Sequence, residues 1–488
     1  MSTAGNISDT INIPRFMIAG THSGVGKTTI TTAVMAALAG EGYRVQPYKV
    51  GPDYIDPTYH TIVTGNRSRN LDAWILREET VKRLFTSSAV RSDVAVIEGV
   101  MGVFDGSSGT GDNGSSAHIA KLLKCPVVLI LDVKSMARSA AAVALGFKNF
   151  DPEMNIAGII LNRIGSDRHL RLVREAIEKY CGIPVVGYVR KNANLELPSR
   201  HLGLVPTVEG GELTDMVNSL AGEIREGIDL DCLIDIARSA VHLDVQANEI
   251  PEIKGGSDQG QGQNNISGDP KVRIGIALDE AFSFYYQDGL EVLEQCGAEL
   301  VPFSPVHDAG LPGDIDGIYI GGGFPEMFIG ELAANHGLMR KIKEAGSAGM
   351  PVFAECGGLM YLSASIVDFE GTRYPMVGLV PASCIMEKKL VGMGYVEAES
   401  LTENILAPAG KKARGHEFHY SRIEPETADF SWAYRLGRNR YRETVMDGYS
   451  EGSVLASYVH HHFASDPELA ARFIDKCSQF KKNRERKG

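Results

Sequence analysis

The chain has 488 residues, of which 43% are hydrophobic and 23% charged, a balance typical of a globular protein with two or three domains. A net charge of −12 argues against a nucleic acid partner, and the longest apolar run, residues 126–131, is far below the ~18 residues that span a membrane. Seven scattered cysteines without a C-x-x-C pair exclude a disulfide framework or zinc site and favour a cytoplasmic protein.

Short β-branched runs alternate with stretches of helical periodicity through the first half of the chain. Residues 1–12 are polar and do not predict a signal peptide. The alternation predicts a mostly parallel sheet with helices on both faces, and therefore an α/β domain over residues 13–250. Strands are expected at residues 16–19, 94–98, 127–133 and 156–162, and a helix at 28–41.

Residues 251–270 interrupt this pattern with a run rich in Gly, Gln and Asn. Such a composition buries too little apolar surface to offset its conformational entropy, so it predicts a flexible linker. A second α/β domain is expected over residues 271–480, with strands at 273–278, 317–320 and 352–355. The basic tail, residues 476–488, is expected to be frayed.

The segment GTHSGVGKTT, residues 20–29, stands between the first expected strand and the first expected helix. Backbone N–H groups of such a loop surround phosphates, its lysine neutralises them, and its hydroxyl binds Mg²⁺. Thr21 occupies the place of the first glycine in the strict pattern, a variation seen in dethiobiotin synthetase and its relatives; the alternative is a plain glycine-rich turn. The expected nucleotide contacts are Gly24, Gly26, Lys27, Thr28 and Thr29.

Polar residues end three of the apolar runs, as expected for a phosphoryl-transfer site. Lys49 is expected to stabilise phosphoryl charge, while Asp53 and Glu98 join Thr28 at the Mg²⁺. The alternative for these residues is a solvated loop or strand end. Asn162 is expected to read the adenine ring, with a helix cap as the alternative.

A different chemistry is indicated after residue 317. Glycines 321–323 can line an oxyanion site, and Cys356 stands at a strand-turn-helix corner that exposes a nucleophile. His460 is expected to deprotonate Cys356, as in class I glutamine amidotransferases, where the usual triad ends His-x-Glu; here His462 replaces that acid. The alternatives are a core cysteine and metal binding by the three adjacent histidines.

These motifs together resemble the cobyrinate a,c-diamide synthase family along nearly the whole chain. The resemblance implies a dethiobiotin synthetase-like domain linked to a class I glutamine amidotransferase-like domain. It implies amidation of the a and c acetates of a corrinoid with ATP, Mg²⁺ and glutamine or ammonia; methanogen members act on nickel sirohydrochlorin. The motifs, in order, are GTHSGVGKT, YKVGPDYIDP, EGVMG, LPSRHLGLVP, AECGGLMY and GHEFHYS.

The resemblance implies a role for each residue that matches a motif of the family. Lys27 and Thr28 fall on the phosphate loop, Asp53 and Glu98 near the metal and acyl phosphate, and Cys356 and His460 on the amidotransferase pair. Asp56 matches a further acid that steers substrate or intermediate, whereas residues 279–286 and 415–421 match without a clear role. Possible cations for the carboxylates of an anionic tetrapyrrole are Arg163, Arg200 and His201.

Two other functions are weighed against this interpretation. A cobyric acid synthase would amidate four other side chains, but relatives of that enzyme lack the GPDYIDP segment. A partitioning-type ATPase switch would carry a signature lysine at the position of His22. A homodimer, common in related folds, is the possible assembly.

Overall fold

A computed structural model describes residues 8–191, 221–222, 224–246, 272–438 and 444–486. The described residues form two compact units, unit 1 up to residue 246 and unit 2 from residue 272, which are considered separately. The expected linker, residues 251–270, lies outside the described residues, as do the domain boundaries beside it. No described helix has both the length and the apolarity needed to cross a membrane.

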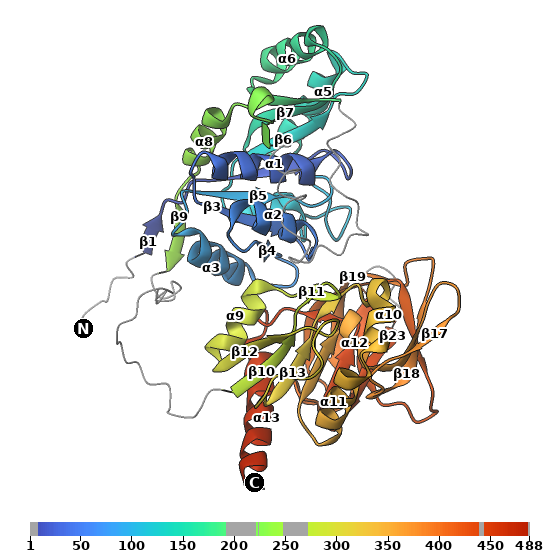
Figure 1. The fold of residues 1–488 in the computed structure, drawn as a ribbon. Helices are drawn as coiled ribbons and strands as arrows, with labels where there is room; N and C mark the ends of the chain where they lie inside the picture. Colours follow the sequence, from blue (N-terminus) through green and yellow to red (C-terminus); the bar gives the residue numbers. More distant parts are fainter. Residues whose placement is uncertain (1–7, 192–220, 223, 247–271, 439–443, 487–488) are drawn as a thin grey trace, which may run out of the picture. The chain divides into compact units, whose positions relative to one another are not determined.

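Unit 1 is built on a seven-stranded sheet whose neighbouring strands all run parallel, which confirms the predicted α/β architecture (Figure 1). The strand order is β4-β3-β5-β2-β6-β7-β8. Strands β2, β3 and β5 are buried along their whole length, as expected for a parallel sheet covered on both faces. The strands are β2 (Arg15–Gly20), β3 (Val45–Val50), β4 (Arg69–Leu71), β5 (Val94–Glu98), β6 (Val127–Asp132), β7 (Ile156–Ile164) and β8 (Val185–Arg190).

Helices connect these strands, and one core cluster packs the apolar residues of α1 and α8 against the sheet. A separate antiparallel pair joins β1 (Ser8–Ile11) to β9 (Leu243–Gln246). The helices are α1 (Lys27–Gly40), α2 (Asp56–Thr64), α3 (Glu78–Ala89), α4 (Ser116–Leu122), α5 (Ser139–Phe150), α6 (Asp167–Cys181) and α8 (Leu230–Arg238).

Unit 2 contains a ten-stranded mixed sheet in the order β12-β10-β13-β15-β24-β23-β22-β19-β20-β25. The first five strands run parallel, and the remaining neighbours are antiparallel. These strands are β10 (Val272–Ala277), β12 (Ala298–Phe303), β13 (Gly317–Ile320), β15 (Val352–Glu355), β19 (Gly392–Ser400), β20 (Lys412–His419), β22 (Trp432–Arg438), β23 (Thr444–Glu451), β24 (Val454–Ser457) and β25 (His460–His461).

Two smaller sheets complete unit 2, one pairing β11 with β14 and one in the order β17-β16-β18-β21. Their strands are β11 (Phe282–Phe284), β14 (Gly322–Gly323), β16 (Ser363–Val367), β17 (Arg373–Pro375), β18 (Val380–Met386) and β21 (Ser421–Pro425). The helices are α9 (Gln287–Gln295), η2 (Pro325–Phe328), α10 (Ile329–Ala334), α11 (His336–Ser347), α12 (Gly357–Leu362) and α13 (Pro467–Glu485).

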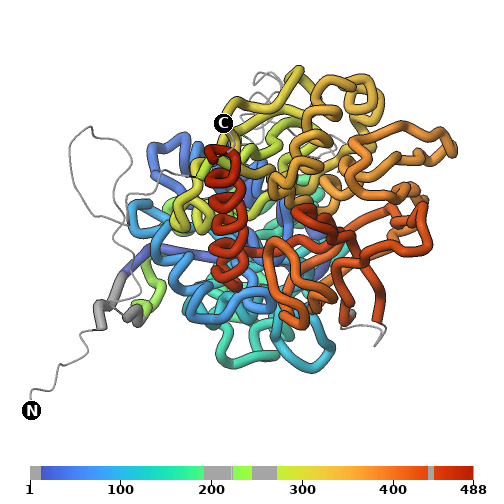
Figure 2. Tube along the Cα trace, turned by 90° about the horizontal axis from the view of Figure 1, so that it is seen from below, coloured from blue at the N-terminus to red at the C-terminus, as the bar shows by residue number. Residues whose placement is uncertain are grey.

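The expectation of a frayed tail after residue 476 is wrong. Helix α13, the red helix in Figure 2, continues to Glu485. Cys477 is buried, and Arg484 donates to the carbonyl of Ile315 at 2.8 Å and to the carboxylate of Asp316 at 2.9 Å. These contacts hold the basic residues against the fold, which charge composition alone did not predict.

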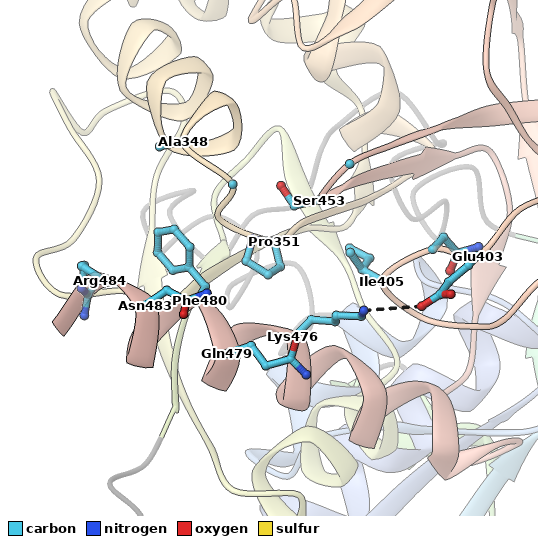
Figure 3. Close-up of a pocket in the computed structure, with 13 residues that line it drawn as sticks. Ala348, Pro351, Glu403, Ile405, Ser453, Lys476, Gln479, Phe480, Asn483 and Arg484 are labelled. Carbon is cyan, nitrogen blue, oxygen red and sulfur yellow. Dashed lines mark ion pairs between the residues drawn. The ribbon is translucent and has the colours of Figure 1, made fainter. Parts of the chain in front are cut away.

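A cavity of about 750 Å³ lies in unit 2 beside α13 (Figure 3). Pro351 and Ser453, which immediately precede the parallel strands β15 and β24, form part of its lining together with Ile405 and Phe480. The cavity is therefore at the amino ends of these strands. Residues that follow the carboxyl ends of these strands, among them Cys356, lie at the opposite ends of the strands.

Candidate active sites

The phosphate loop of unit 1 follows the central strand β2 and leads into α1. Gly24 and Gly26 have φ values of 80° and 97°, in the left-handed region that favours glycine. No side chain of the described chain caps the N-terminus of α1, and no acid lies in its first turn. Its N–H groups and positive end are therefore available to an anion. The Lys27 ammonium donates to the carbonyl of His22 at 3.3 Å, and burial followed by the charge of Lys49 lowers its pKa.

A cluster of one lysine and two acids lies next to this loop. Lys49 and Glu98 are paired across β3 and β5, and their Nζ and Oε1 atoms are 2.8 Å apart. The same ammonium is 2.6 Å from Oδ2 of Asp56. Thr28 Oγ1 is 2.8 Å from the Glu98 oxygen and 3.1 Å from the Asp56 oxygen. The structure thus brings four predicted residues from four separate segments into one cluster.

Burial and charge act against each other in this cluster. Burial alone would lower the pKa of Lys49, but the carboxylates of Glu98, Asp56 and Asp53 raise it well above its usual value. Burial likewise opposes ionisation of Glu98, yet Lys49 and His60 hold its pKa below the ordinary range. Burial and the charge of Glu98 raise the pKa of Asp56. The cluster contains more carboxyl groups than cations and so suits a further cation.

Asp53 has a different place from the one expected. Its Oδ1 accepts hydrogen bonds from the backbone N–H groups of Ile55 at 2.8 Å and Asp56 at 3.1 Å, while its Oδ2 is 3.9 Å from Lys49 Nζ. Asp53 therefore holds the turn that orients Asp56. The oxygens nearest Thr28 belong to Asp56 and Glu98, so these two carboxylates fit Mg²⁺, which prefers oxygen ligands and takes few of them from protein.

Asn162 ends up beside the phosphate loop, at the end of β7. Its Nδ2 donates to the carbonyl of Val25 at 2.8 Å, and its Oδ1 accepts from the backbone N–H of Arg163. A Cβ on Gly26 would lie 2.6 Å from this Nδ2, so the close packing requires glycine. The helix-cap alternative is wrong, because α6 is capped by Ser166. One N–H and one lone pair of Asn162 remain for a nucleotide base.

The expected cations for substrate carboxylates are only partly described. Arg163 has a left-handed backbone, with φ 63°, and its exposed guanidinium is 2.5 Å from Asp132. Backbone strain of this kind often accompanies functional positions. Arg200 and His201, together with the LPSRHLGLVP segment, lie outside the described residues.

Sequence reasoning missed His60, a fully buried residue of α2. Its Nε2 is 2.7 Å from Oε2 of Glu98, and its Nδ1 is 3.4 Å from Ser68 Oγ. His60 therefore holds the carboxylate of Glu98 from the side opposite Lys49. A signal was present, since Asp56 and His60 are four residues apart and share one face of a helix.

In unit 2, Cys356 lies at the corner between β15 and α12, as predicted. Its φ of 49° and ψ of −105° are strained for a residue with a side chain, and its N–H donates to the carbonyl of Ser457 at 2.7 Å. A Cβ on Gly357 would lie 3.1 Å from the backbone nitrogen of Gly323, so the corner between β15 and α12 packs directly on β14. Burial and then the charge of Glu326 raise the pKa of the Cys356 thiol.

His460 follows the carboxyl end of β24, the strand next to β15, and so lies at the same end of the parallel strands as Cys356. It belongs to β25, which pairs with β20. Its imidazole packs on Gly322, where an added Cβ would collide with Cε1 and lie 3.2 Å from Nε2. Burial followed by the neighbouring histidines lowers the pKa of His460 to about 3. The imidazole is therefore neutral at pH 7 and can accept a proton, although so low a pKa makes it a weak base for a thiol whose own pKa is raised.

The two motifs without a predicted role build the walls of this site. Residues 279–286 include β11, which pairs with Gly322 and Gly323, and Tyr285, whose hydroxyl accepts from the N–H of Gly321 at 2.8 Å. Residues 415–421 include the end of β20, which pairs with β25. The carbonyl of Phe418 is 3.8 Å from the Cys356 sulfur. Both motifs thus position the glycines, the cysteine and the histidine.

For the glutamine amidotransferase chemistry that the sequence resemblance implies, we expect Gly322→Ala to lower kcat for glutamine hydrolysis by about 10²-fold, because the methyl group would displace the His460 imidazole. Ammonia-dependent product formation should be unchanged. Gly330→Ala in α10 is the matched control, since nothing lies within 4 Å of its added Cβ. Steady-state assays with both nitrogen sources measure the effect, and wild-type hydrolysis by Gly322→Ala would contradict the position assigned to His460.

Comparisons with protein families agree with this division into two chemistries. The CobQ/CobB/MinD/ParA nucleotide binding domain family matches residues 16–205, which carry the phosphate loop, Lys49, Glu98 and Asn162. The CobB/CobQ-like glutamine amidotransferase domain family matches residues 273–468, which carry Cys356 and His460.

Curated relatives match over nearly their whole length. A cobyrinate a,c-diamide synthase of Dehalococcoides mccartyi strain CBDB1 is 47% identical over 470 residues, covering 95% of this chain and 98% of the relative. One from Methanosarcina acetivorans is 43% identical over 499 residues and covers 97% of each chain. A hydrogenobyrinate a,c-diamide synthase of Streptomyces coelicolor is 41% identical over 490 residues, covering 95% and 98%.

Proposed function

The chain belongs to the family of cobyrinate and hydrogenobyrinate a,c-diamide synthases, and we propose that it is a glutamine-hydrolysing ligase that amidates the a and c acetate side chains of a tetrapyrrole. The observation that carries the proposal is the presence of two sites in one chain. Unit 1 holds a phosphate loop with a lysine-carboxylate cluster, and unit 2 holds a strained cysteine near a neutral histidine. The first suits activation of a carboxylate and the second suits release of ammonia.

In unit 1, an oxygen of the substrate carboxylate attacks the γ-phosphorus of ATP, ADP leaves, and an acyl phosphate forms. Lys27 and Lys49 stabilise the charge of the transferring phosphoryl group. Mg²⁺, held by Thr28, Asp56 and Glu98, would neutralise phosphate charge when bound. Ammonia then attacks the acyl carbon, phosphate leaves, and an amide remains. Asp53 keeps Asp56 in place, Thr29 extends the phosphate contacts, and Asn162 reads the adenine.

In unit 2, His460 takes the proton from Cys356, and the thiolate attacks the side-chain amide carbon of glutamine. The N–H groups of β14, Gly322 and Gly323, stabilise the oxyanion, because the N–H of Gly321 already donates to the Tyr285 hydroxyl. His460 passes its proton to the departing ammonia, which leaves a glutamyl thioester that water hydrolyses to glutamate. Strain at Cys356 keeps its sulfur at the turn, where an extended substrate amide can reach it.

The proposal includes an anionic tetrapyrrole as acceptor, either cobyrinate or nickel sirohydrochlorin, with Arg163 among the groups that meet its carboxylates. A cytoplasmic setting is supported by the seven free cysteines of the described chain. A homodimer is the proposed assembly, by analogy with related folds.

Mass spectrometry tests the acceptor directly. The protein is incubated with ATP, Mg²⁺ and glutamine, and with cobyrinate or nickel sirohydrochlorin separately; ATP is omitted in the control. We expect two successive decreases of about one mass unit, each from replacement of OH by NH₂. Two amidations on one macrocycle identify the physiological acceptor. Two on both indicate that the supply of substrate decides which macrocycle is amidated. Four amidations would instead favour the cobyric acid synthase alternative, and none on either would contradict the proposed reaction.

A further inference from the structure

Hydrogen bonds to the main chain hold residues 457–461, the short segment that carries His460. The carbonyl of Ser457 accepts from the N–H of Cys356 at 2.7 Å. The N–H of Tyr458 donates to the carboxylate of Asp447 at 3.1 Å. The N–H of His461, the residue after the proposed base, donates to Oε1 of Glu355 at 2.7 Å. The last of these bonds holds the segment beyond His460, where β25 also pairs with β20 through His461 and Gly415.

His462, which stands where the amidotransferase class has its third acid, has a different role. Its ring stacks on Tyr286, with centroids 4.4 Å apart and planes 21° apart. Its Nδ1 faces the backbone N–H of Ala464 at 3.2 Å and so acts as an acceptor. Burial lowers the pKa of His462 to about 3, which keeps this imidazole neutral. A neutral ring turned to its own backbone cannot replace an acid that orients the base.

Glu355 has the features of a residue that orients the base. It immediately precedes Cys356, is 2% exposed, and uses one oxygen for His461 N–H and the other for the hydroxyl of Tyr319 at 2.8 Å. Tyr319 is itself held by a stacked contact with Phe353 and an edge contact with Tyr285. Glu355 is therefore a rigid acceptor anchored between strands β13 and β25.

The contact to His461 is made by its backbone and not by its ring. Both ring nitrogens of His461 lack a hydrogen-bond partner among the described residues. Burial raises the pKa of Glu355 to about 8, although the bonds from His461 and Tyr319 lower it. A carboxyl oxygen accepts a hydrogen bond from an N–H in either protonation state.

We propose that Glu355 is a positioning residue for glutamine hydrolysis: through the main chain of His461 it holds His460 at the Cys356 corner, the role that the class gives to an acid at the position of His462. The inference rests on the proposed use of Cys356 and His460. It assigns the effect to an acceptor oxygen rather than to a negative charge. An isosteric amide should therefore serve as well as the acid, and an apolar side chain should not.

Glutamine hydrolysis by the full chain tests this assignment with three variants. Glu355→Met removes the acceptor at similar volume, and we expect kcat to fall by about 10²-fold while KM for glutamine changes by less than about two-fold. Glu355→Gln keeps an acceptor oxygen and should stay within about three-fold of wild-type kcat. Tyr319→Phe removes the other bond to Glu355 and should behave like Glu355→Gln.

Urea denaturation of each variant, followed by the tyrosine fluorescence and circular dichroism of the full chain, reports whether unit 2 is still folded, because ammonia-dependent amidation depends on unit 1. Unchanged kcat in Glu355→Met overturns the proposal. If Glu355→Met does not fold, Glu355→Gln decides alone: retained kcat supports the acceptor role, whereas a loss near 10²-fold with an unchanged denaturation midpoint overturns it in favour of a charge effect. Absence of glutamine hydrolysis in the wild-type protein would contradict the proposed function instead, so the two failures are distinguishable.

Discussion

Cys356→Ala should abolish glutamine-dependent amidation, with a loss on the order of 10⁴-fold or more, because the thiolate of Cys356 is the group that forms the thioester. Amidation from free ammonia should remain close to wild-type, since the phosphate loop, Lys49 and Glu98 belong to a separate unit. The measurement is product formation with glutamine and with an ammonium salt at equal ATP and acceptor. The contrast between the two nitrogen sources is larger than for any other single substitution considered.

Cys477→Ala is the matched control, because Cys477 is also a buried, free cysteine of unit 2 but lies in α13. It should reduce stability slightly through a small cavity while leaving glutamine use unchanged. Equal loss of both activities in Cys356→Ala would show that Cys356 supports the fold rather than the chemistry. Retained glutamine use would remove Cys356 from the mechanism.

The parallel sheet of unit 1 was predictable because its strands are buried on both faces and read as continuous apolar runs. Polar residues that follow such runs must meet at the carboxyl ends of the parallel strands. The sequence could therefore predict that Lys49, Glu98 and the phosphate loop form one site. The distinction between Asp53 and Asp56 could not be predicted. It depends on which carboxylate turns back to cap its own loop, as Asp53 does for Ile55 and Asp56.

Unit 2 was less predictable for physical reasons. Between residues 363 and 451 the chain forms eight strands in two sheets, most of them antiparallel, where the sequence indicated only a general α/β pattern. Half-buried strands alternate polar and apolar residues and are easily mistaken for loops. The role of Glu355 was also invisible, because its partners Tyr319 and His461 are 36 and 106 residues away.

Lys49→Met should lower amidation by about 10³-fold with either nitrogen source, because the phosphoryl charge loses a fixed cation. It should also destabilise unit 1, by up to about 3–5 kcal/mol, since the fully buried carboxylate of Glu98 would lose its ammonium partner next to Asp56 and keep its contacts with His60 and Thr28. Glutamine hydrolysis in unit 2 should persist in this variant. Initial rates and urea denaturation measure the two effects independently.

The double variant Lys49→Met/Glu98→Gln separates stability from catalysis. Removing both charges eliminates the buried carboxylate that has lost its ammonium partner, and Asp56, whose pKa is already raised, can remain protonated. We therefore expect stability to return toward wild-type while amidation stays lost. Lys121→Met is the control, because its ion pairs with Asp112 and Asp151 are partly exposed and contribute at most about 1 kcal/mol. Recovery of amidation in the double variant would mean that Lys49 serves only to neutralise Glu98, and equal instability of single and double variants would rule out the buried charge as its cause.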